Sequence, residues 1–177
     1  MNYMGINACD LANGPGIRVS VWVSGCSIHC PGCHNPESWD FNQGKPWGEE
    51  EMELLFNFLN TPYIQGLTIT GGNPLENPNE HDIRQIIEMV KTKLPEKDIW
   101  LYTGWELPNE VFIDATWWTR ATNDFNYIIE NCDVIVDGPY IQEQRDITLP
   151  YRGSKNQRLI DVKKTKEKNE IILWKEE

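Results

Sequence analysis

The sequence has no long apolar run and no excess of basic residues. No stretch approaches the roughly 20 apolar residues that span a membrane, and the N-terminus lacks the basic-then-apolar pattern of a signal peptide. The chain has 16 basic and 27 acidic residues and a formal net charge of −11. Binding a nucleic-acid backbone needs a dominant basic face, so we expect no nucleic-acid partner. The lack of a membrane span and of a signal peptide predicts a soluble, cytoplasmic protein that does not bind membranes.

Linkers and internal repeats are also absent. The 177 residues contain no long stretch rich in Pro, Gly or Ser, and this length suits one hydrophobic core. We expect a single domain over residues 1–177, of which 163–177 form an extension. The mixed charges of the extension are typical of a solvated arm, and its apolar end could add an edge strand. A positive patch is left open around Arg145, Arg152, Lys155 and Arg158.

Three of the five cysteines stand close together. Cys26, Cys30 and Cys33 directly follow the apolar, strand-like run 17–23. Their close spacing and the odd total disfavour disulfides. A loop of the form C-x3-C-x2-C can bind three irons of a 4Fe–4S cluster, which leaves the fourth iron open to a small molecule.

A structural zinc site is the main alternative for these cysteines. Zinc takes four tetrahedral ligands, so the loop would have to recruit His29, His34 or Cys9. The spacing suits zinc poorly, but the residues alone leave both metals open. Cys132 leads into an apolar run, and we expect it and Cys9 to be structural, since buried cysteine commonly behaves as a small apolar residue.

Apolar patterning predicts alternating strands and helices. The expected strands are 17–24, 66–70, 98–102, 133–137 and 158–162, and the expected helices are about 49–60, about 79–94 and parts of 107–131. Alternation favours parallel strands with ligands at their carboxyl ends. The cysteine loop and the turn at residues 71–74 both follow such ends, so we expect them to form one site.

The chain is too short for a closed barrel of eight strand–helix units, which takes about 250 residues. We therefore expect an α/β fold in which a parallel sheet forms a partial, open barrel. The stretch 107–124 looks inserted and is expected to be a helix with an extended approach. Trp22, Trp100 and Trp105 lie on or beside strands and are expected to fill the core.

The cysteine spacing after a first strand resembles the radical S-adenosylmethionine superfamily. Gly71, Gly72, Asn73 and Pro74 resemble its Gly-Gly-acidic-Pro turn, which lies against the methionine part of S-adenosylmethionine. Glycines there permit a close approach. Asn73 departs from the pattern, because it lacks the negative charge but keeps a side-chain carbonyl that can accept a hydrogen bond from the ammonium group.

Further segments resemble the activating proteins of anaerobic (class III) ribonucleotide reductases. They are residues 98–104, 133–139 and 151–162, whereas residues 13–18 resemble a segment of the activating enzymes of glycyl-radical proteins in general. The resemblance covers about residues 2–162. It implies reductive cleavage of S-adenosylmethionine at a 4Fe–4S cluster. The 5′-deoxyadenosyl radical would then take a hydrogen from a glycine of the reductase and leave a glycyl radical, with no protein acid or base required.

The resemblance also implies roles for individual residues. Cys26, Cys30 and Cys33 would bind the cluster. Residues expected to contact S-adenosylmethionine are Gly32, Cys33, His34, Gly71, Gly72, Asn73, Pro74, Tyr102 and Thr103. Residues expected to contact the partner protein are Arg18, Arg152, Asn156 and Arg158. The expected partners are the large subunit of the anaerobic reductase and a low-potential electron donor such as flavodoxin, and a homodimer is left open.

Two other functions remain open. One is a different short radical enzyme, either another glycyl-radical activase or a deazaguanine-type synthase acting on a small molecule, although the segment 152–158 argues against both. The other is a zinc-stabilised protein-binding module, which would consume no S-adenosylmethionine.

Overall fold

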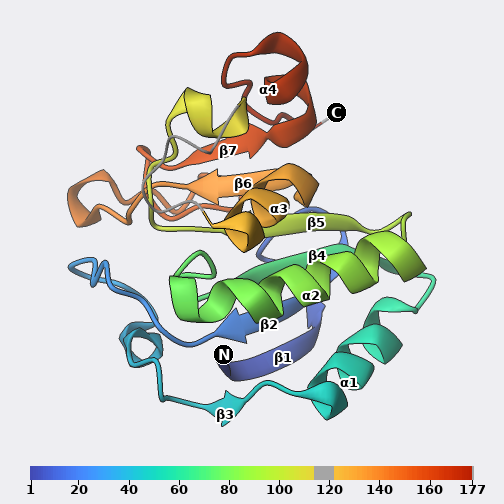
Figure 1. Ribbon diagram of the computed structural model, residues 1–177. Helices are drawn as coiled ribbons and strands as arrows, with labels where there is room; N and C mark the ends of the chain where they lie inside the picture. Colours follow the sequence, from blue (N-terminus) through green and yellow to red (C-terminus); the bar gives the residue numbers. More distant parts are fainter. Residues whose placement is uncertain (114–121, 177) are drawn as a thin grey trace.

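A seven-stranded mixed sheet forms the centre of the computed structural model, which describes residues 1–113 and 122–176 (Figure 1). Across the sheet the strands are β3 (Lys45–Pro46), β1 (Asn2–Asp10), β2 (Ile17–Val23), β4 (Ile64–Gly71), β5 (Asp98–Tyr102), β6 (Val134–Asp137) and β7 (Arg158–Asp161). Strands β2, β4, β5 and β6 are parallel, whereas β3, β1 and β7 pair antiparallel. In the described part of the chain the edge strands β3 and β7 do not pair, so the sheet is open.

Three helices cover one face of this sheet (Figure 1). They are α1 (Glu49–Leu59), α2 (Asn77–Lys93) and α3 (Asn123–Asn131), and each lies between two successive parallel strands of the chain. Because these strands are added in one direction across the sheet, crossovers of one hand place all three helices on the same side. The remaining helices are α4 (Val162–Lys168) and the short 3-10 turns η1 (Pro36–Trp39), η2 (Asn109–Phe112) and η4 (Gln142–Gln144).

Local signals explain where the helices begin. Thr122 caps α3, since its side chain accepts a hydrogen bond from Phe125 N. Asp161 caps α4 in the same way through Lys164 N. Helix α2 has Pro in its first turn and Lys91 and Lys93 in its last, which suits the missing N–H of proline and the helix dipole.

Successive side chains of β5 point to opposite faces of the sheet and so belong to two different apolar clusters. Ile99 and Leu101 belong to the main core, which includes fully buried residues of α1, α2 and α3. Trp100 points the other way, into a smaller cluster with Val134, Val136 and Leu159. Each fully buried aliphatic or aromatic side chain contributes roughly 1.5–3 kcal/mol, so the larger cluster supplies most of the apolar stabilisation.

The smaller cluster is closed by the C-terminal segment. The ring of Trp174 lies edge-on to that of Trp100, with 4.9 Å between the centroids, and Tyr151 packs edge-on to Trp100 at 5.4 Å. Trp174 N donates a hydrogen bond to Leu159 O, and Leu173 forms an isolated antiparallel bridge with Ile160. The apolar end of the chain therefore extends the sheet edge by a single bridge.

The prediction of an α/β fold with an open sheet is confirmed, and the five expected strands are present within two residues of their predicted ends. The expectation of a parallel sheet is wrong at both edges, because β1, β3 and β7 are antiparallel. The expected solvated arm begins instead with α4. Within 107–124 the structure contains η2 and the start of α3, and residues 114–121 lie outside the described residues.

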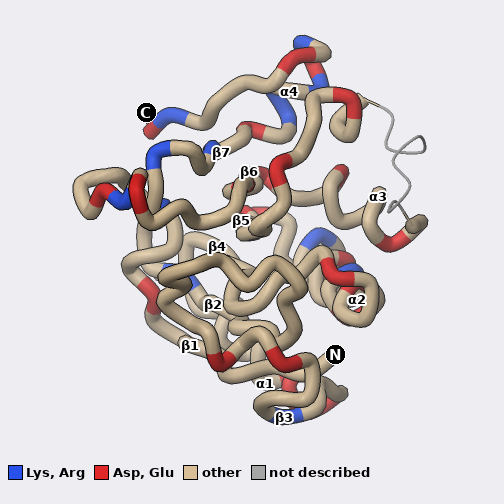
Figure 2. The backbone as a smooth tube through the Cα atoms, turned by 90° about the vertical axis from the view of Figure 1, so that its left-hand side faces the viewer, with Lys and Arg blue, Asp and Glu red and all other residues tan. Residues whose placement is uncertain are grey.

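Of the residues expected to be structural, Trp100 and Cys132 are buried, but Cys9 is exposed on β1. No helix in residues 1–113 and 122–176 is both long and apolar enough to cross a membrane. Acidic and basic residues alternate along the segment between β6 and β7 (Figure 2).

Candidate functional site

The cysteine loop and the Gly-Gly-Asn-Pro turn meet at the carboxyl ends of β2 and β4. Gly72 N donates a hydrogen bond of 2.8 Å to Val23 O, and Asn73 N donates one of 2.8 Å to Gly25 O, directly before Cys26. A Cβ atom on Gly72 would lie 2.5 Å from the Gly25 carbonyl oxygen. The contact therefore needs glycine, and the two motifs form one site.

Backbone N–H groups surround the thiols of the cysteine loop. Asn35 N lies 3.4 Å from Cys33 Sγ. The amides of Ile28 and His29 donate to Cys26, and the amide of Tyr140 donates to Cys30. Burial raises the pKa of both Cys26 and Cys30, and negative neighbours add to the effect. These thiols therefore favour the protonated form until a metal displaces the proton.

The loop suits a cluster better than a single zinc ion. Of the side chains that zinc would have to recruit, His29 stacks on Trp39 at 4.6 Å and His34 lies edge-on to Trp22. A cubane needs no fourth protein ligand, and it holds its thiolates farther apart because each binds a different iron.

Hydrogen bonds from backbone amides to sulfur are also what iron–sulfur clusters use to tune their potentials. The residues present thus fit a 4Fe–4S cluster, for which Cys26, Cys30 and Cys33 are the candidate ligands.

A cleft of about 540 Å³ opens beside the cysteine loop. Its walls come from the loop itself, from the ends of β4 and β5 and from the segment between β6 and β7. Residues that line it include Gly32, His34, Thr70, Tyr102, Tyr140 and Arg152. The cleft therefore begins beside the cysteine loop and extends to Ala12 and Asn13 before β2, and it is large enough for a small molecule.

The residues expected to contact S-adenosylmethionine divide into two groups. Gly32, His34 and Tyr102 line the cleft, and Cys33, Gly71 and Gly72 are partly exposed. Asn73, Pro74 and Thr103 are buried.

Asn73 corrects one expectation. It has no exposed surface, and its side-chain oxygen accepts hydrogen bonds from Thr103 Oγ1 at 2.9 Å and Leu75 N at 3.3 Å. The carbonyl expected to receive the ammonium group is already bonded within the protein. Thr103, which donates this hydrogen bond to the turn, is also buried and does not line the cleft.

Tyr102 holds one wall of the cleft. Its hydroxyl donates a hydrogen bond of 2.7 Å to the carbonyl oxygen of Tyr151. Burial raises the pKa of this hydroxyl far above its usual value, so Tyr102 stays neutral and keeps its donor. The bond links the end of β5 to the segment between β6 and β7.

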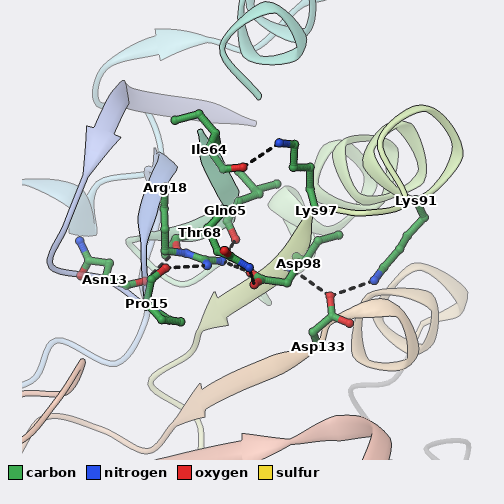
Figure 3. A network of polar contacts seen from close by, with 12 residues as sticks. Asn13, Pro15, Arg18, Ile64, Gln65, Thr68, Lys91, Lys97, Asp98 and Asp133 are labelled. Carbon is green, nitrogen blue, oxygen red and sulfur yellow. Dashed lines mark hydrogen bonds and ion pairs between the residues drawn. The ribbon is translucent and has the colours of Figure 1, made fainter. Parts of the chain in front are cut away.

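Arg18 corrects the expectation of a contact with the partner protein (Figure 3). Its side chain is completely buried; Nε donates to Thr68 Oγ1 and Nη2 donates to Leu67 O, each at 2.8 Å. These contacts lie at the amino ends of the parallel strands, opposite to the cysteine loop. A guanidinium in that position cannot reach another protein, because the fold surrounds it.

The other three expected contact residues lie between β6 and β7 or at the start of β7. Arg158 donates to both carboxylate oxygens of the fully buried Asp137 and to Leu107 O, which favours a structural role. Arg152 Nη1 donates to Gln157 O, and Asn156 Nδ2 donates to Pro139 O at 2.7 Å. Arg152 also lines the cleft.

The sequence analysis missed Ser27 and Glu76. Glu76 stands immediately before α2, and one of its oxygens accepts two hydrogen bonds from Ser27, beside Cys26. The available signal was an acidic residue three positions after Asn73. Tyr140 and Gln142, which reach the cysteine loop from the opposite wall, gave no signal in the sequence.

Known proteins resemble this chain over most of its length. A family model described as a 4Fe-4S single cluster domain matches residues 12–160. The anaerobic ribonucleoside-triphosphate reductase-activating protein of Enterobacteria phage T4 is 39% identical over 159 residues, which are 90% of this chain and 93% of that protein.

The proteins of the same name from Escherichia coli K12 and Haemophilus influenzae are 35% and 38% identical, over 89% of this chain and 96% of theirs. The chain therefore belongs to the family of anaerobic ribonucleoside-triphosphate reductase-activating proteins.

Proposed function

We propose that this protein activates an anaerobic ribonucleotide reductase by reductive cleavage of S-adenosylmethionine at a 4Fe–4S cluster. The observation that carries the proposal is the direct contact between the cysteine loop and the Gly-Gly-Asn-Pro turn, through Asn73 N and Gly25 O, beside a cleft of about 540 Å³. The match to a 4Fe-4S domain and the names of the relatives support the cluster and the target protein.

The chain's own residues place and enclose the reactants. Cys26, Cys30 and Cys33 bind three irons, and their backbone amide donors hold the sulfurs. We take the open sheet as a partial barrel of the radical S-adenosylmethionine type, whose mouth is the cleft. When bound, the cluster would pass one electron to S-adenosylmethionine, whose sulfur–carbon bond would break to give methionine and a 5′-deoxyadenosyl radical, and this radical would take a hydrogen atom from a glycine of the reductase.

We propose that S-adenosylmethionine binds in the cleft. Gly32, His34 and Tyr102 form its walls, and Gly71 and Gly72 allow the turn to approach closely. Since the side-chain carbonyl of Asn73 is already occupied, binding of the ammonium group falls to backbone carbonyls of the turn.

The partner protein approaches from the segment between β6 and β7, where Arg152 lines the cleft. Asn156 acts with it by holding the shape of this segment through Pro139 O. A low-potential donor such as flavodoxin would supply the electron.

The test is anaerobic reconstitution with iron and sulfide, followed by metal analysis and detection of 5′-deoxyadenosine after reduction. We expect about four irons per chain and cleavage of S-adenosylmethionine. Cys30→Ser should lose both, whereas the exposed Cys9→Ser should keep both. One zinc per chain with no cleavage under the same oxygen-free conditions would refute the proposal.

The assignment of the docking segment has its own test. Arg152→Ala and Asn156→Ala should lower formation of the glycyl radical on the reductase while cleavage of S-adenosylmethionine without the reductase continues. Lys155→Ala is the matched control, because Lys155 lies between them with an exposed side chain and only a long contact to Asp146. Unchanged radical formation in both variants would place the docking surface elsewhere.

A further inference from the structure

Glu76 joins the two motifs of the site through a single carboxylate oxygen. Its Oε1 accepts hydrogen bonds from Ser27 N at 2.9 Å and Ser27 Oγ at 2.6 Å. The same atom lies 3.4 Å from Asn73 Nδ2. Ser27 directly follows Cys26, and Asn73 belongs to the Gly-Gly-Asn-Pro turn. This oxygen therefore connects the start of the cysteine loop to the turn that follows β4.

The charge of Glu76 is buried and has no basic partner. The residue is 8% exposed. Among residues 1–113 and 122–176, no Lys, Arg or His side chain forms an ion pair with it. The hydrogen bonds from Ser27 and Asn73 stabilise the carboxylate, as burial of a charged group requires, but they do not neutralise it.

The chain thus has its negative charge at an unexpected position. The turn carries the neutral Asn73 where the resemblance expects an acid, and the acid stands three residues later, against the cysteine loop. Asn79 adds a neutral link from the same helix, since its Nδ2 donates to Ser24 O and Asn73 O. The next acid, Glu80, accepts a hydrogen bond from Thr122 Oγ1.

We propose that Glu76 is a positioning residue of the cluster site, which fixes the start of the cysteine loop through Ser27 and places an uncompensated negative charge beside Cys26. The inference rests on the proposed function. A negative charge close to an iron–sulfur cluster disfavours the added electron and so lowers the reduction potential. Glu76 therefore keeps the cluster strongly reducing and the loop in place.

The experiment measures the potential of the reconstituted cluster by redox titration followed with electron paramagnetic resonance. Glu76→Gln keeps an oxygen that accepts from Ser27 but removes the charge. We expect iron content to stay the same and the ratio of reduced to oxidised cluster at a fixed potential to rise about tenfold, which equals about 59 mV for one electron.

Two further variants separate charge from geometry. Glu76→Asp keeps the charge, and we expect its ratio to stay within about threefold of the wild type. Glu80→Gln is the matched control, because it removes a buried carboxylate one turn later on α2 that does not touch the loop. Its ratio should also be unchanged.

The inference would be overturned if Glu76→Gln, with its full iron content, had the same ratio of reduced to oxidised cluster as the wild type. It would also be overturned if this ratio changed tenfold in Glu76→Asp, or if it changed as much in Glu80→Gln as in Glu76→Gln. If the wild type binds the cluster and cleaves S-adenosylmethionine while Glu76→Gln keeps its ratio, only this inference fails. If the wild type binds no cluster, the proposed function fails and the inference fails with it.

Discussion

Arg18 Nη2 and Asp98 Oδ1 form an ion pair of 2.5 Å at the end of the sheet opposite to the cysteine loop (Figure 3). The pair joins β2 to β5 across β4, where the Arg18 guanidinium also bonds Thr68 and Leu67. Its two members differ in exposure, since the Arg18 side chain is fully buried and that of Asp98 is 28% exposed. Gln65 Nε2 donates a hydrogen bond of 3.2 Å to the other carboxylate oxygen of Asp98, Oδ2.

This difference predicts an asymmetric response to mutation. Asp98→Asn leaves a fully buried guanidinium without its carboxylate, and we expect a loss of about 3–5 kcal/mol in the free energy of unfolding. The double variant Arg18→Met/Asp98→Asn should lose less, because no unpaired charge remains. Urea denaturation of the metal-free protein measures both.

The control for this pair is the more exposed ion pair of Lys91 and Asp133, also drawn in Figure 3. Lys91→Met should cost no more than about 1 kcal/mol. A loss in Asp98→Asn as small as this would show that the buried pair contributes little.

Gly72 sets the distance between the turn and the cysteine loop. In Gly72→Ala the new Cβ would lie 2.5 Å from the backbone oxygen of Gly25, whose peptide groups are held by hydrogen bonds to Ser38 O and from Asn73 N. We expect a loss of about 1–3 kcal/mol in stability and a lower iron content after reconstitution. Gly5→Ala is the control, because no atom lies within 4 Å of its Cβ position. Normal iron content in Gly72→Ala would show that the close approach is not needed for the cluster.

Asp10 predicts a dependence of stability on pH. Burial alone would raise the pKa of its carboxyl group, but hydrogen bonds from Asn13, Ser20 and the backbone of Ala12 outweigh burial and lower the pKa below 3.8. A carboxyl group whose pKa is lower in the folded state stabilises the fold above its unfolded pKa, and this contribution disappears as the pH falls through the folded pKa.

The variant Asp10→Asn should therefore lose about 1–3 kcal/mol at pH 7, and the difference from the wild type should shrink below pH of about 4. Urea denaturation at several pH values measures this. If the free energy of unfolding differed between Asp10→Asn and the wild type by the same amount at every pH, the loss would come from altered packing or hydrogen bonding and not from the charge of Asp10.

Trp174 attaches the C-terminal segment to the sheet. Trp174→Ala removes its edge-on contacts with Trp100 and Tyr151 and should cost about 1.5–3 kcal/mol, less than a fully buried tryptophan, because Trp174 is only half-buried. Lys175→Ala, at an exposed neighbour, should change stability little. Equal stability of the two variants would mean that the segment is not held by this side chain.

The parallel centre of the sheet and the meeting of the two motifs could be predicted because their signals are local. Val19, Val21 and Val23 mark β2, the three cysteines follow at once, and glycines mark the turn after β4. Strand β1 could not be predicted in this way. Its sequence alternates weakly, and half-exposed residues occupy much of both faces, so pairing with β2 forms it more than its own pattern does.

The polar contacts of the site depend on residues far apart in the chain. Arg18 forms its ion pair with Asp98, and Glu76 accepts its hydrogen bonds from Ser27, 49 positions away. The sequence likewise suggests that Asn73 is an exposed turn residue, whereas in the structure it is buried and accepts a hydrogen bond from Thr103. Such contacts follow only from the assembled sheet.

The contact between Trp100 and Trp174 has an optical consequence. Two indole rings with centroids 4.9 Å apart and planes inclined at 77° couple their ultraviolet transitions. A coupled pair held in one chiral arrangement gives two circular-dichroism bands of opposite sign. Because one ring is on β5 and the other on the C-terminal segment, these bands should vanish when the segment detaches, so the protein reports the attachment of its own end without an added label.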